Sequence, residues 1–271
     1  MGRIVSAAAT SHTFGTTSEA EASAEAILKG MATIGRAIEA SKPNVLLVVS
    51  SDHLNNFNLD AQIPLAVGIA DEYMPLGDMG VPRDQVRGNR EFAQAFANHC
   101  ADVGFDLVPV EGINPDHGVG FPNAFCNSTG GATLVPLFVN TVMRPAPSCQ
   151  RAYQLGHAFR NFVETQRPDY ERVAVVGSGG LSHWICLPDS GRVNEEWDRF
   201  VLESLASGNG SALAKLTCDD ILRDGGNGGL EIATWAFVAG ACGEARGEVI
   251  YYEPMRSWWT GMGGVLMHLD N

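Results

Sequence analysis

The chain has 271 residues, a length that allows one large domain or two small ones. Apolar residues make up 45% and charged residues only 18%, which excludes an intrinsically disordered chain. The low charged fraction predicts that surface is buried between the subunits of a homo-oligomer. The formal net charge is −13 and no basic patch offsets it, so we expect no nucleic-acid partner, because a polyanionic backbone would be repelled.

The cysteines and the N-terminus indicate the cellular compartment. The six cysteines are scattered, without the close pairs of a zinc ribbon or the density of a disulfide framework. The opening sequence MGRIVSAAATSH has no apolar run of signal-peptide length, and no stretch approaches the roughly 20 apolar residues of a membrane span. We therefore expect a cytoplasmic protein with reduced thiols and no membrane contact.

Short β-branched runs alternate with segments of helical periodicity along the whole chain. In chain order, we expect elements at 4–9 (strand), 18–41 (helix), 45–49 (strand), 89–103 (helix), 107–110 (strand), 134–140 (strand), 149–165 (helix), 173–176 (strand), 194–207 (helix), 230–242 (helix), 249–252 (strand) and 265–269 (strand). Residues 71–88, rich in Pro and Gly, predict a long surface excursion. The alternation predicts a single α/β domain over residues 1–271, with a mainly parallel central sheet flanked by helices on both faces.

Four of the seven histidines follow predicted strands. They are His12 in ATSH, His53 in VVSSDH, His117 in the Gly- and Pro-rich loop NPDHGVGFP, and His183 in GSGGLSH. A single histidine in a loop is usually only hydrogen-bonded to backbone. Because α/β proteins build sites at the carboxyl ends of parallel strands, four histidines in this placement predict a shared site.

Glu231 adds a carboxylate to this group. It is the only charged residue between Asp224 and Glu244, in a segment that is apolar nearly all round. A buried carboxylate must be paired or neutralised, and a metal ion is one such partner. Alternatively, Glu231 lies in a first helical turn and favours the positive end of the helix dipole. Two histidines and one carboxylate suit non-haem Fe(II) oxygenases and zinc hydrolases alike, so these donors alone do not choose the reaction.

Together these motifs resemble the class III extradiol ring-cleaving dioxygenases, the superfamily of the protocatechuate 4,5-dioxygenase β subunit and the 2,3-dihydroxyphenylpropionate dioxygenases. The resemblance runs from end to end, over TSH, SSDH, PDHG, VVGSGGLSHW, GRVNEEWDRF and the Glu231 helix. It implies that Fe(II) is bound by His12, His53 and Glu231. It also implies that His117 and His183 are the catalytic acid/base groups.

The activity that the resemblance implies is extradiol cleavage of a catecholic ring, with incorporation of both atoms of O2, in the degradation of aromatic compounds. A redox-active iron lets electron density pass from the ring to dioxygen, which zinc could not do. We expect His183 to accept a phenolic proton and His117 to donate one as the ring opens. Asp52 and Asp116 either orient the neighbouring histidines or are solvated turn residues.

Three alternatives remain at this point. The same site could open an o-aminophenol; a Zn-dependent hydrolase could use His12, His53 and Glu231 with a metal-bound water; or the chain could be a non-catalytic subunit. The C-terminal YYEPMRSWWTGMGG is more similar to the phenylpropionate branch, and NEEWDRF to the protocatechuate branch, so the substrate stays open.

Several further residues are candidates for contact with the substrate, although each could equally be ordinary packing. They are Arg256, as the cation for a carboxylated catechol, and the aromatic residues Phe121, Trp184, Trp258 and Trp259. A small α subunit, if there is one, would be a separate chain.

Overall fold

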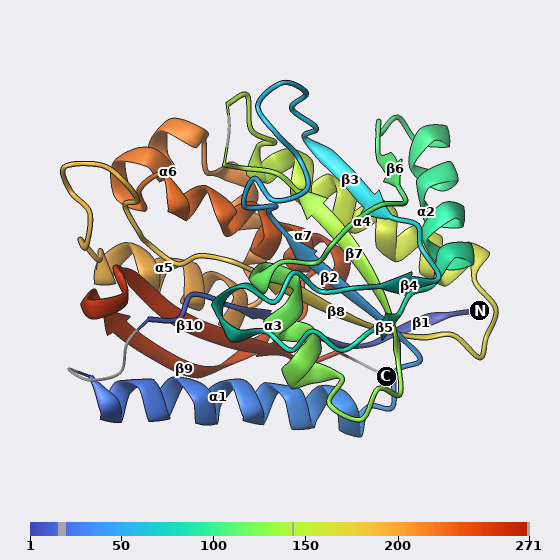
Figure 1. The fold of residues 1–271 in the computed structure, drawn as a ribbon, viewed down its shortest axis with the longest axis horizontal. Coiled ribbons are helices and arrows are strands. Elements are labelled where there is room, and N and C mark those ends of the chain that lie inside the picture. The colour runs from blue at the N-terminus through green and yellow to red at the C-terminus, as the bar shows by residue number, and fades with distance from the viewer. Residues whose placement is uncertain (16–19, 143, 270–271) are drawn as a thin grey trace.

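The computed structural model describes residues 1–15, 20–142 and 144–269. Its main sheet is built from β1 (Arg3–Thr10), β2 (Val45–Ser50), β3 (Leu65–Gly68), β6 (Val108–Val110), β7 (Thr133–Val139), β8 (Arg172–Ser178), β9 (Gly247–Met255) and β10 (Thr260–Met267). These strands lie in the order β6-β3-β7-β2-β8-β1-β10-β9 (Figure 1). A separate two-stranded sheet pairs β4 (Glu72–Tyr73) with β5 (Val86–Arg87).

The centre of the main sheet is parallel. Strands β7, β2, β8 and β1 are parallel neighbours, whereas β3 pairs antiparallel with β7, and β10 pairs antiparallel with β1 and β9. Strand β2 reads VLLVVS and is buried at every position, because helices cover a central parallel strand on both faces. The predicted mainly parallel sheet is therefore confirmed, with its antiparallel pairs toward the edges.

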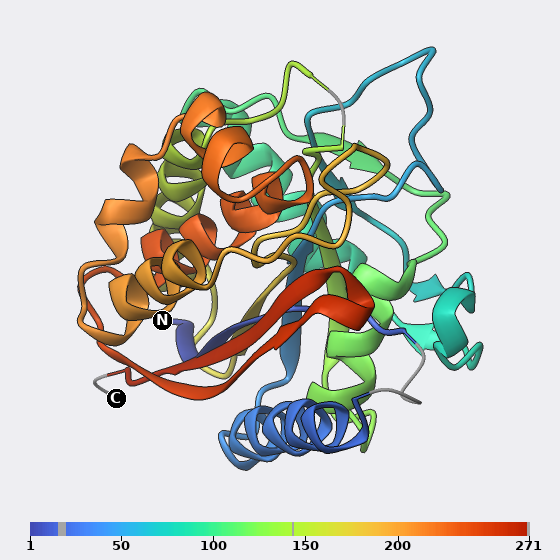
Figure 2. The same ribbon diagram turned by 90° about the vertical axis from the view of Figure 1, so that its left-hand side faces the viewer.

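Helices cover both faces of this sheet. One face packs against α1 (Glu21–Ala40) and α3 (His117–Cys126), and the other against α2 (Arg90–Asp102), α4 (Cys149–Gln166), α5 (Glu195–Ala206) and α7 (Ile232–Cys242). Figure 2 shows α1 in blue on one side of the red strands β9 and β10, with the orange helices on the other side. Within β2, Leu46 and Val48 join the first core, whereas Leu47 and Val49 join the second, as the two-residue period of a strand requires.

Short helices complete the chain. They are α6 (Cys218–Asp224) and the 3-10 helices η1 (Asp78–Gly80), η2 (Gly210–Lys215), η3 (Gly228–Glu231) and η4 (Arg256–Trp258). None of the helices in the described part of the chain is both long enough and apolar enough to cross a membrane.

The predicted elements are present, with ends that move by a few residues. The first helix begins at Glu21, while residues 18 and 19 of its predicted range lie outside the described residues. The helix predicted at 230–242 begins as the 3-10 turn η3 and continues as α7. Strand β3, α6 and η2 were not predicted, and residues 71–88 contain the β4–β5 pair and η1.

One expectation is wrong. The segment NPDHGVGFP is not wholly a loop, because helix α3 begins at His117. The Asp116 side chain accepts a hydrogen bond from the Gly118 backbone N–H at 3.0 Å and so caps the helix. Two glycines and Pro122 hide this helix in the sequence, although the cap residue is a recognised start signal.

Candidate active site and metal centre

The five residues singled out in the sequence lie together at one edge of the main sheet. The loops after β1, β2 and β8 carry His12, His53 and His183, while α3 begins with His117 and η3 ends with Glu231. Strands β1, β8 and β2 are consecutive parallel neighbours, so their carboxyl ends bring these loops to the same place.

Glu231 is the centre of this group. Its carboxylate is buried, with Oε1 3.0 Å from Nε2 of His53, and with Oε2 3.8 Å from Nε2 of His12 and 4.0 Å from Nε2 of His183. The Gly180 backbone N–H donates to Oε2 at 2.9 Å. One carboxylate is therefore shared by three imidazoles.

His117 completes the cluster from α3. Its ring centroid lies 4.2 Å from that of His53 and 5.1 Å from that of His12. A nitrogen of each of these three rings lies within 4.8 Å of the other two, a spacing at which one metal ion could be held. The structure thus brings all five residues together, and it allows two sets of metal ligands, one with Glu231 and one with His117.

Three of the imidazoles have Nδ1 bonded to an oxygen that can only accept. The acceptors are Asp116 Oδ2 for His53 at 2.9 Å, Asp78 Oδ2 for His117 at 2.5 Å and the Leu181 carbonyl for His183 at 2.9 Å. Because a carboxylate or carbonyl oxygen has no proton to give, Nδ1 carries the proton in each ring. A neutral ring then has its lone pair on Nε2, the nitrogen available to a metal ion or a substrate proton.

His12 reaches the same tautomer through a serine. Nδ1 of His12 lies 2.8 Å from the Ser178 hydroxyl, and that hydroxyl donates its only proton to the Gly118 carbonyl at 2.6 Å. The carbonyl is free to accept because Pro122, four residues later in α3, has no backbone N–H. Ser178 must therefore accept from Nδ1–H of His12, which leaves the lone pair on Nε2.

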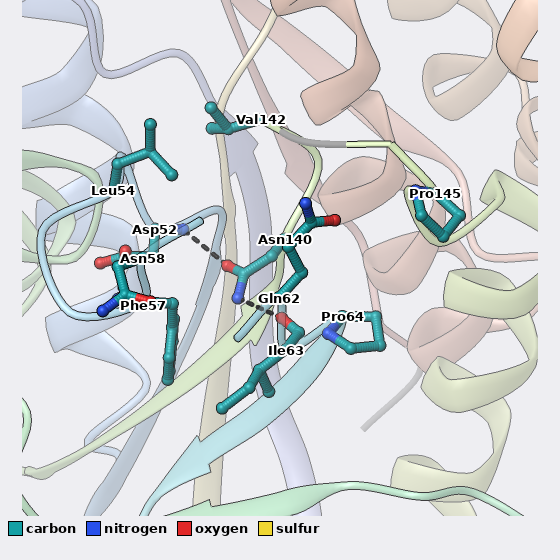
Figure 3. Close-up of a pocket in the computed structure, with 10 residues that line it drawn as sticks. All are labelled: Asp52, Leu54, Phe57, Asn58, Gln62, Ile63, Pro64, Asn140, Val142 and Pro145. Carbon is teal, nitrogen blue, oxygen red and sulfur yellow. Dashed lines mark hydrogen bonds between the residues drawn. The ribbon is translucent and has the colours of Figure 1, made fainter. Parts of the chain in front are cut away.

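The loop that carries His53 is shaped by its neighbour Asp52. The buried Asp52 carboxylate accepts the backbone N–H groups of residues 55–57 at 3.0–3.1 Å. The Asp52 backbone N–H donates to Asn140 Oδ1 at 2.8 Å, and Asn140 Nδ2 donates to the Ile63 carbonyl at 2.7 Å (Figure 3). Asp52 thus builds the turn, and the ring of His53 is oriented by Asp116.

A cavity of about 220 Å³ opens beside this loop (Figure 3). Its wall is mainly apolar, with Leu54, Phe57, Ile63 and Val142, and none of the five predicted site residues is among the described residues that line it. The cavity therefore adjoins the turn that positions His53 and not the cluster of Nε2 atoms.

Burial and charge act in opposite directions on these groups. Burial alone would raise the pKa of Glu231 and of Asp116, but the neighbouring histidines hold both below the ordinary carboxyl value. Burial would lower the pKa of His53, yet hydrogen bonds to Asp116 and Glu231 raise it to about 10, while burial lowers the pKa of His12 to about 3. Without a metal ion, His53 is therefore protonated and its Nε2–H donates to the Glu231 carboxylate. A divalent metal ion would displace that proton and bind Nε2 and the ionised carboxylate together, so the donor set fits such an ion.

A family model described as the catalytic LigB subunit of aromatic ring-opening dioxygenase matches residues 6–263. The chain belongs to this family. The resemblance and the reaction class expected from the sequence, extradiol cleavage of a catecholic ring with O2, are confirmed. The match argues against the zinc hydrolase and the non-catalytic subunit.

Relatives of this LigB-family chain carry the name 2,3-dihydroxyphenylpropionate/2,3-dihydroxicinnamic acid 1,2-dioxygenase. The relative from Photorhabdus laumondii is 27% identical over 94% of this chain and 95% of its own length. The relative from Cupriavidus necator is 28% identical over 86% of this chain and 87% of its own length. An uncharacterized protein from Escherichia coli K12, of known crystal structure, shares the fold with a TM-score of 0.61 at 14% identity, and covers 97% of this chain and 100% of its own.

Three of the aromatic candidates lie in two different surroundings. Phe121 packs on Phe14 with ring centroids 4.3 Å apart, and Phe14 lies 5.6 Å from the buried Trp258. Trp259 is 53% exposed, so its ring lies mainly at the surface. Phe14 lies two residues after His12. In this LigB-family chain it therefore links α3, through Phe121, to the C-terminal segment, through Trp258.

The predicted cation is already paired. The Arg256 guanidinium forms an ion pair with Glu195 at 2.7 Å. Arg192 lies over the ring of Trp184, 4.5 Å from its centroid, and has no carboxylate within ion-pair distance among the described residues. Arg192 is thus a cation that the sequence reasoning did not consider, stacked on Trp184, the residue after His183.

Other contacts that hold the site were either missed or assigned to the wrong partner. Asp78 binds His117 from 39 positions earlier in the chain, and no sequence signal connects the two. Asp116 precedes His117 in the sequence but holds His53. Ser178 ends a strand that leads into GSGG, so its position at the site edge could have been noticed.

Proposed function

We propose that this protein is an Fe(II)-dependent extradiol dioxygenase that opens a catecholic ring. The metal ligands in this proposal are His12, His53 and Glu231, and the acid/base residues are His117 and His183. The observation that carries it is the convergence of Nε2 atoms on the buried, ionised carboxylate of Glu231. The family supplies the reaction class, and the donor set supplies the metal chemistry.

Charge favours Glu231 over His117 as the third ligand. A set of three histidines would leave an ionised carboxylate buried 3.0 Å from Nε2 of His53 without forming part of the metal site. Leaving a charge buried and unpaired is strongly unfavourable, whereas binding it to the cation removes the penalty. His117 is then free to handle protons.

The partners of the two remaining histidines suit different proton roles. The Nδ1–H of His117 donates to the carboxylate of Asp78, whose side chain is 26% exposed and so connects this ring to solvent, the source of a proton for a donor. The Nδ1–H of His183 donates to the Leu181 carbonyl, which fixes the tautomer of a neutral base. We assign the phenolic proton to Nε2 of His183, and the proton delivered during ring opening to His117.

Iron supplies the redox step when it is bound, because a redox-active centre lets electron density pass from the catechol to dioxygen. The protein's part is to bring the catechol ring beside Nε2 of His183, and to keep Nε2 of each neutral ring unprotonated. The aromatic pair of Phe14 and Phe121 lies next to His12 and α3 and offers an apolar wall to an aromatic ring.

The direct test is anaerobic reconstitution with Fe(II), followed by oxygen uptake. The panel holds catechol, carboxylated catechols such as 2,3-dihydroxyphenylpropionate, and o-aminophenols, with Zn(II)-loaded protein as the control. We expect oxygen uptake and a yellow ring-opened product with the Fe(II)-loaded protein and neither with the Zn(II)-loaded protein. Protein that is confirmed to hold iron and takes up no oxygen with any compound would overturn the proposal.

Alanine variants test the assignment of roles. We expect His12→Ala and Glu231→Ala to retain less than about a tenth of the iron. His183→Ala and His117→Ala should keep the iron and lose roughly 100-fold or more in turnover. His157→Ala, on the exposed surface of α4, is the matched control and should change neither. If Glu231→Ala kept its full iron content while His117→Ala lost its iron, the third metal ligand would be His117 and not Glu231.

We also propose that the protein is a homo-oligomer. Leu54, Val142 and Ile185, in the loops after β2, β7 and β8, are 46%, 44% and 43% exposed, so apolar side chains border the same edge as the site. Light scattering after size exclusion gives the mass. A monomer at micromolar concentration would contradict this, and a gain in mass only with a second, small chain would indicate a separate α subunit.

We propose that the protein is cytoplasmic. The six cysteines are free thiols, which supports a reducing, cytoplasmic location. We propose that residues 1–271 act as one catalytic domain, because the site draws on loops from His12 to Glu231.

A further inference from the structure

Asp198 is a buried carboxylate that the proposed reaction does not use. It lies near the start of α5, in the sequence motif NEEWDRF, and is fully buried. Its Oδ1 atom accepts the Ser182 backbone N–H at 2.8 Å, and its Oδ2 atom accepts the Tyr252 hydroxyl at 2.9 Å. Because a buried carboxylate is costly without specific partners, these two bonds point to a role for it.

Ser182 is held from two elements at once, through its carbonyl and through its hydroxyl. The Gly261 N–H of β10 donates to the Ser182 carbonyl at 2.9 Å, and the Asn194 N–H at the start of α5 donates to its hydroxyl oxygen at 2.8 Å. A Cβ atom at Gly261 would lie 2.0 Å from Asp198 Oδ2, so glycine is required for β10 to pass this close. Asp198 supplies the remaining contact by accepting the Ser182 N–H.

Ser182 immediately precedes His183. The Nδ1–H of His183 donates to the Leu181 carbonyl, and its Nε2 atom lies 4.0 Å from Glu231 Oε2. The ring and its acceptor thus belong to the same three-residue segment, 181–183. A shift of this segment would move both the Cα atom of His183 and the carbonyl that fixes its tautomer.

Loss of the acceptor would leave the buried Ser182 N–H unpaired. An unpaired buried donor is unfavourable, so the segment would move to find a new partner. A displacement of about 1 Å can cost roughly 100-fold in rate when it misplaces a catalytic group. Burial raises the pKa of Asp198 to about 6, so its carboxylate is still mainly ionised at neutral pH and accepts from both donors.

We propose that Asp198 is a positioning residue for His183: through the Ser182 N–H it holds residues 181–183 so that Nε2 of His183 faces Glu231. Tyr252 holds the Asp198 carboxylate in turn. Since His183 accepts the phenolic proton only under the proposed function, the catalytic part of this role rests on that function. The position of the ring is a separate, structural observable.

The test compares Asp198→Leu, which removes the acceptor, with Asp198→Asn, which keeps an oxygen for the Ser182 N–H. Turnover per bound iron, KM for catechol and iron content are measured on the iron-loaded full chain. For Asp198→Leu we expect kcat per iron to fall at least about 30-fold, with KM and iron content within about twofold. Asp198→Asn should stay within about threefold. Glu203→Leu, an exposed carboxylate on the same helix, is the control.

A second readout does not depend on turnover. Proton–nitrogen NMR of the histidine rings, on protein prepared without metal, reports the tautomer of His183, with His117 as the internal reference. We expect Asp198→Leu to lose the single Nδ1–H tautomer at His183 and to leave His117 unchanged. An unchanged His183 signal with wild-type kcat per iron would overturn the proposal.

Three further outcomes are decisive. Equal losses in Asp198→Leu and Asp198→Asn would show that the acceptor oxygen is not what matters. If Asp198→Leu does not fold, Tyr252→Phe replaces it, and an unchanged His183 signal there overturns the proposal. Wild-type protein that holds iron and consumes no oxygen would contradict the proposed function alone, because the NMR comparison still reports on the position of His183.

Discussion

Ser178 determines which nitrogen of His12 faces the candidate metal. Its hydroxyl proton is committed to the Gly118 carbonyl, so it can only accept from His12. The Gly118 carbonyl in turn depends on Pro122, which cannot compete for it. Through the Gly118 carbonyl and Ser178, Pro122 in α3 thus helps to fix the tautomer of His12, a proposed metal ligand in the loop after β1.

Removal of this hydroxyl should weaken the metal site. We expect Ser178→Ala to lower the affinity for Fe(II) about 10- to 100-fold, the usual effect of losing a partner that orients a metal-ligating histidine. Pro122→Ala, which restores a competing N–H, should give a smaller loss in the same direction. Anaerobic titration with Fe(II) measures both, and wild-type affinity in Ser178→Ala would refute the link.

Glycine at position 228 is required for the position of His183. A Cβ atom at Gly228 would lie 2.0 Å from Nε2 of His183, whereas one at Gly229 would lie 3.4 Å from its nearest neighbour. We expect Gly228→Ala to displace the ring and to lower turnover at least about 10-fold while iron is retained. Gly229→Ala is the matched control, and steady-state kinetics with iron analysis separates them. Equal activities would contradict the assigned place of the ring.

At the scale of elements, the site depends on how closely α4 and α7 pack. Helix α7 is buried at every position from Ile232 to Cys242 and begins directly after Glu231. Two glycines permit the contact, because a Cβ atom at Gly156 would lie 2.1 Å from the Phe237 carbonyl oxygen, and one at Gly240 would lie 2.0 Å from the Tyr153 carbonyl oxygen. The depth at which Glu231 enters the site is therefore set by backbone contact between two helices.

This contact predicts a stability effect. We expect Gly240→Ala to reduce the free energy of unfolding by about 1–3 kcal/mol, because the backbone of α4 must move aside. Gly112→Ala is the control, since nothing lies within 4 Å of a Cβ atom there. Urea denaturation of both variants measures the difference. Equal unfolding midpoints and slopes for the two variants would show that α4 and α7 accommodate the added methyl group without loss of stability.

At the scale of the whole molecule, the buried carboxylate of Asp198 couples stability to pH. Burial raises its pKa from the ordinary 3.8 to about 6, so the folded state binds this proton more tightly than the unfolded state does. Protonated Asp198 therefore contributes its full stabilisation of the folded state below about pH 4, and this contribution is lost as the pH rises through 6.

Asp198→Asn removes this titration while it keeps an acceptor for Ser182. Relative to the wild type, we expect the variant to gain about 2–3 kcal/mol of stability between pH 4 and pH 8, as the shift in pKa implies. Denaturant unfolding at pH 4.5, 6 and 8 measures this difference. A difference that does not change with pH would mean that Asp198 titrates normally.

Sequence periodicity was sufficient for the layers of the fold. The strand VLLVVS is apolar almost throughout because it is buried on both faces, and α1 carries an apolar stripe because only one of its faces is buried. Both patterns can be recognised within a few neighbouring residues. The same reasoning failed at α3, where glycines and a proline in the helix serve contacts with distant residues. Its Gly118 carbonyl is used by Ser178, 60 positions away.

The sequence by itself determined the fold class, the family and which five residues gather at one edge of the sheet, because side chains after parallel strands meet there. Tertiary structure alone decided what holds them: Asp116 holds His53 and not its neighbour His117, Asp78 holds His117, and Arg256 is already paired with Glu195. These partners come from elsewhere in the chain. Hydrogen bonds between loops depend on distances that only the packed sheet and helices fix, and no local pattern in the sequence records them.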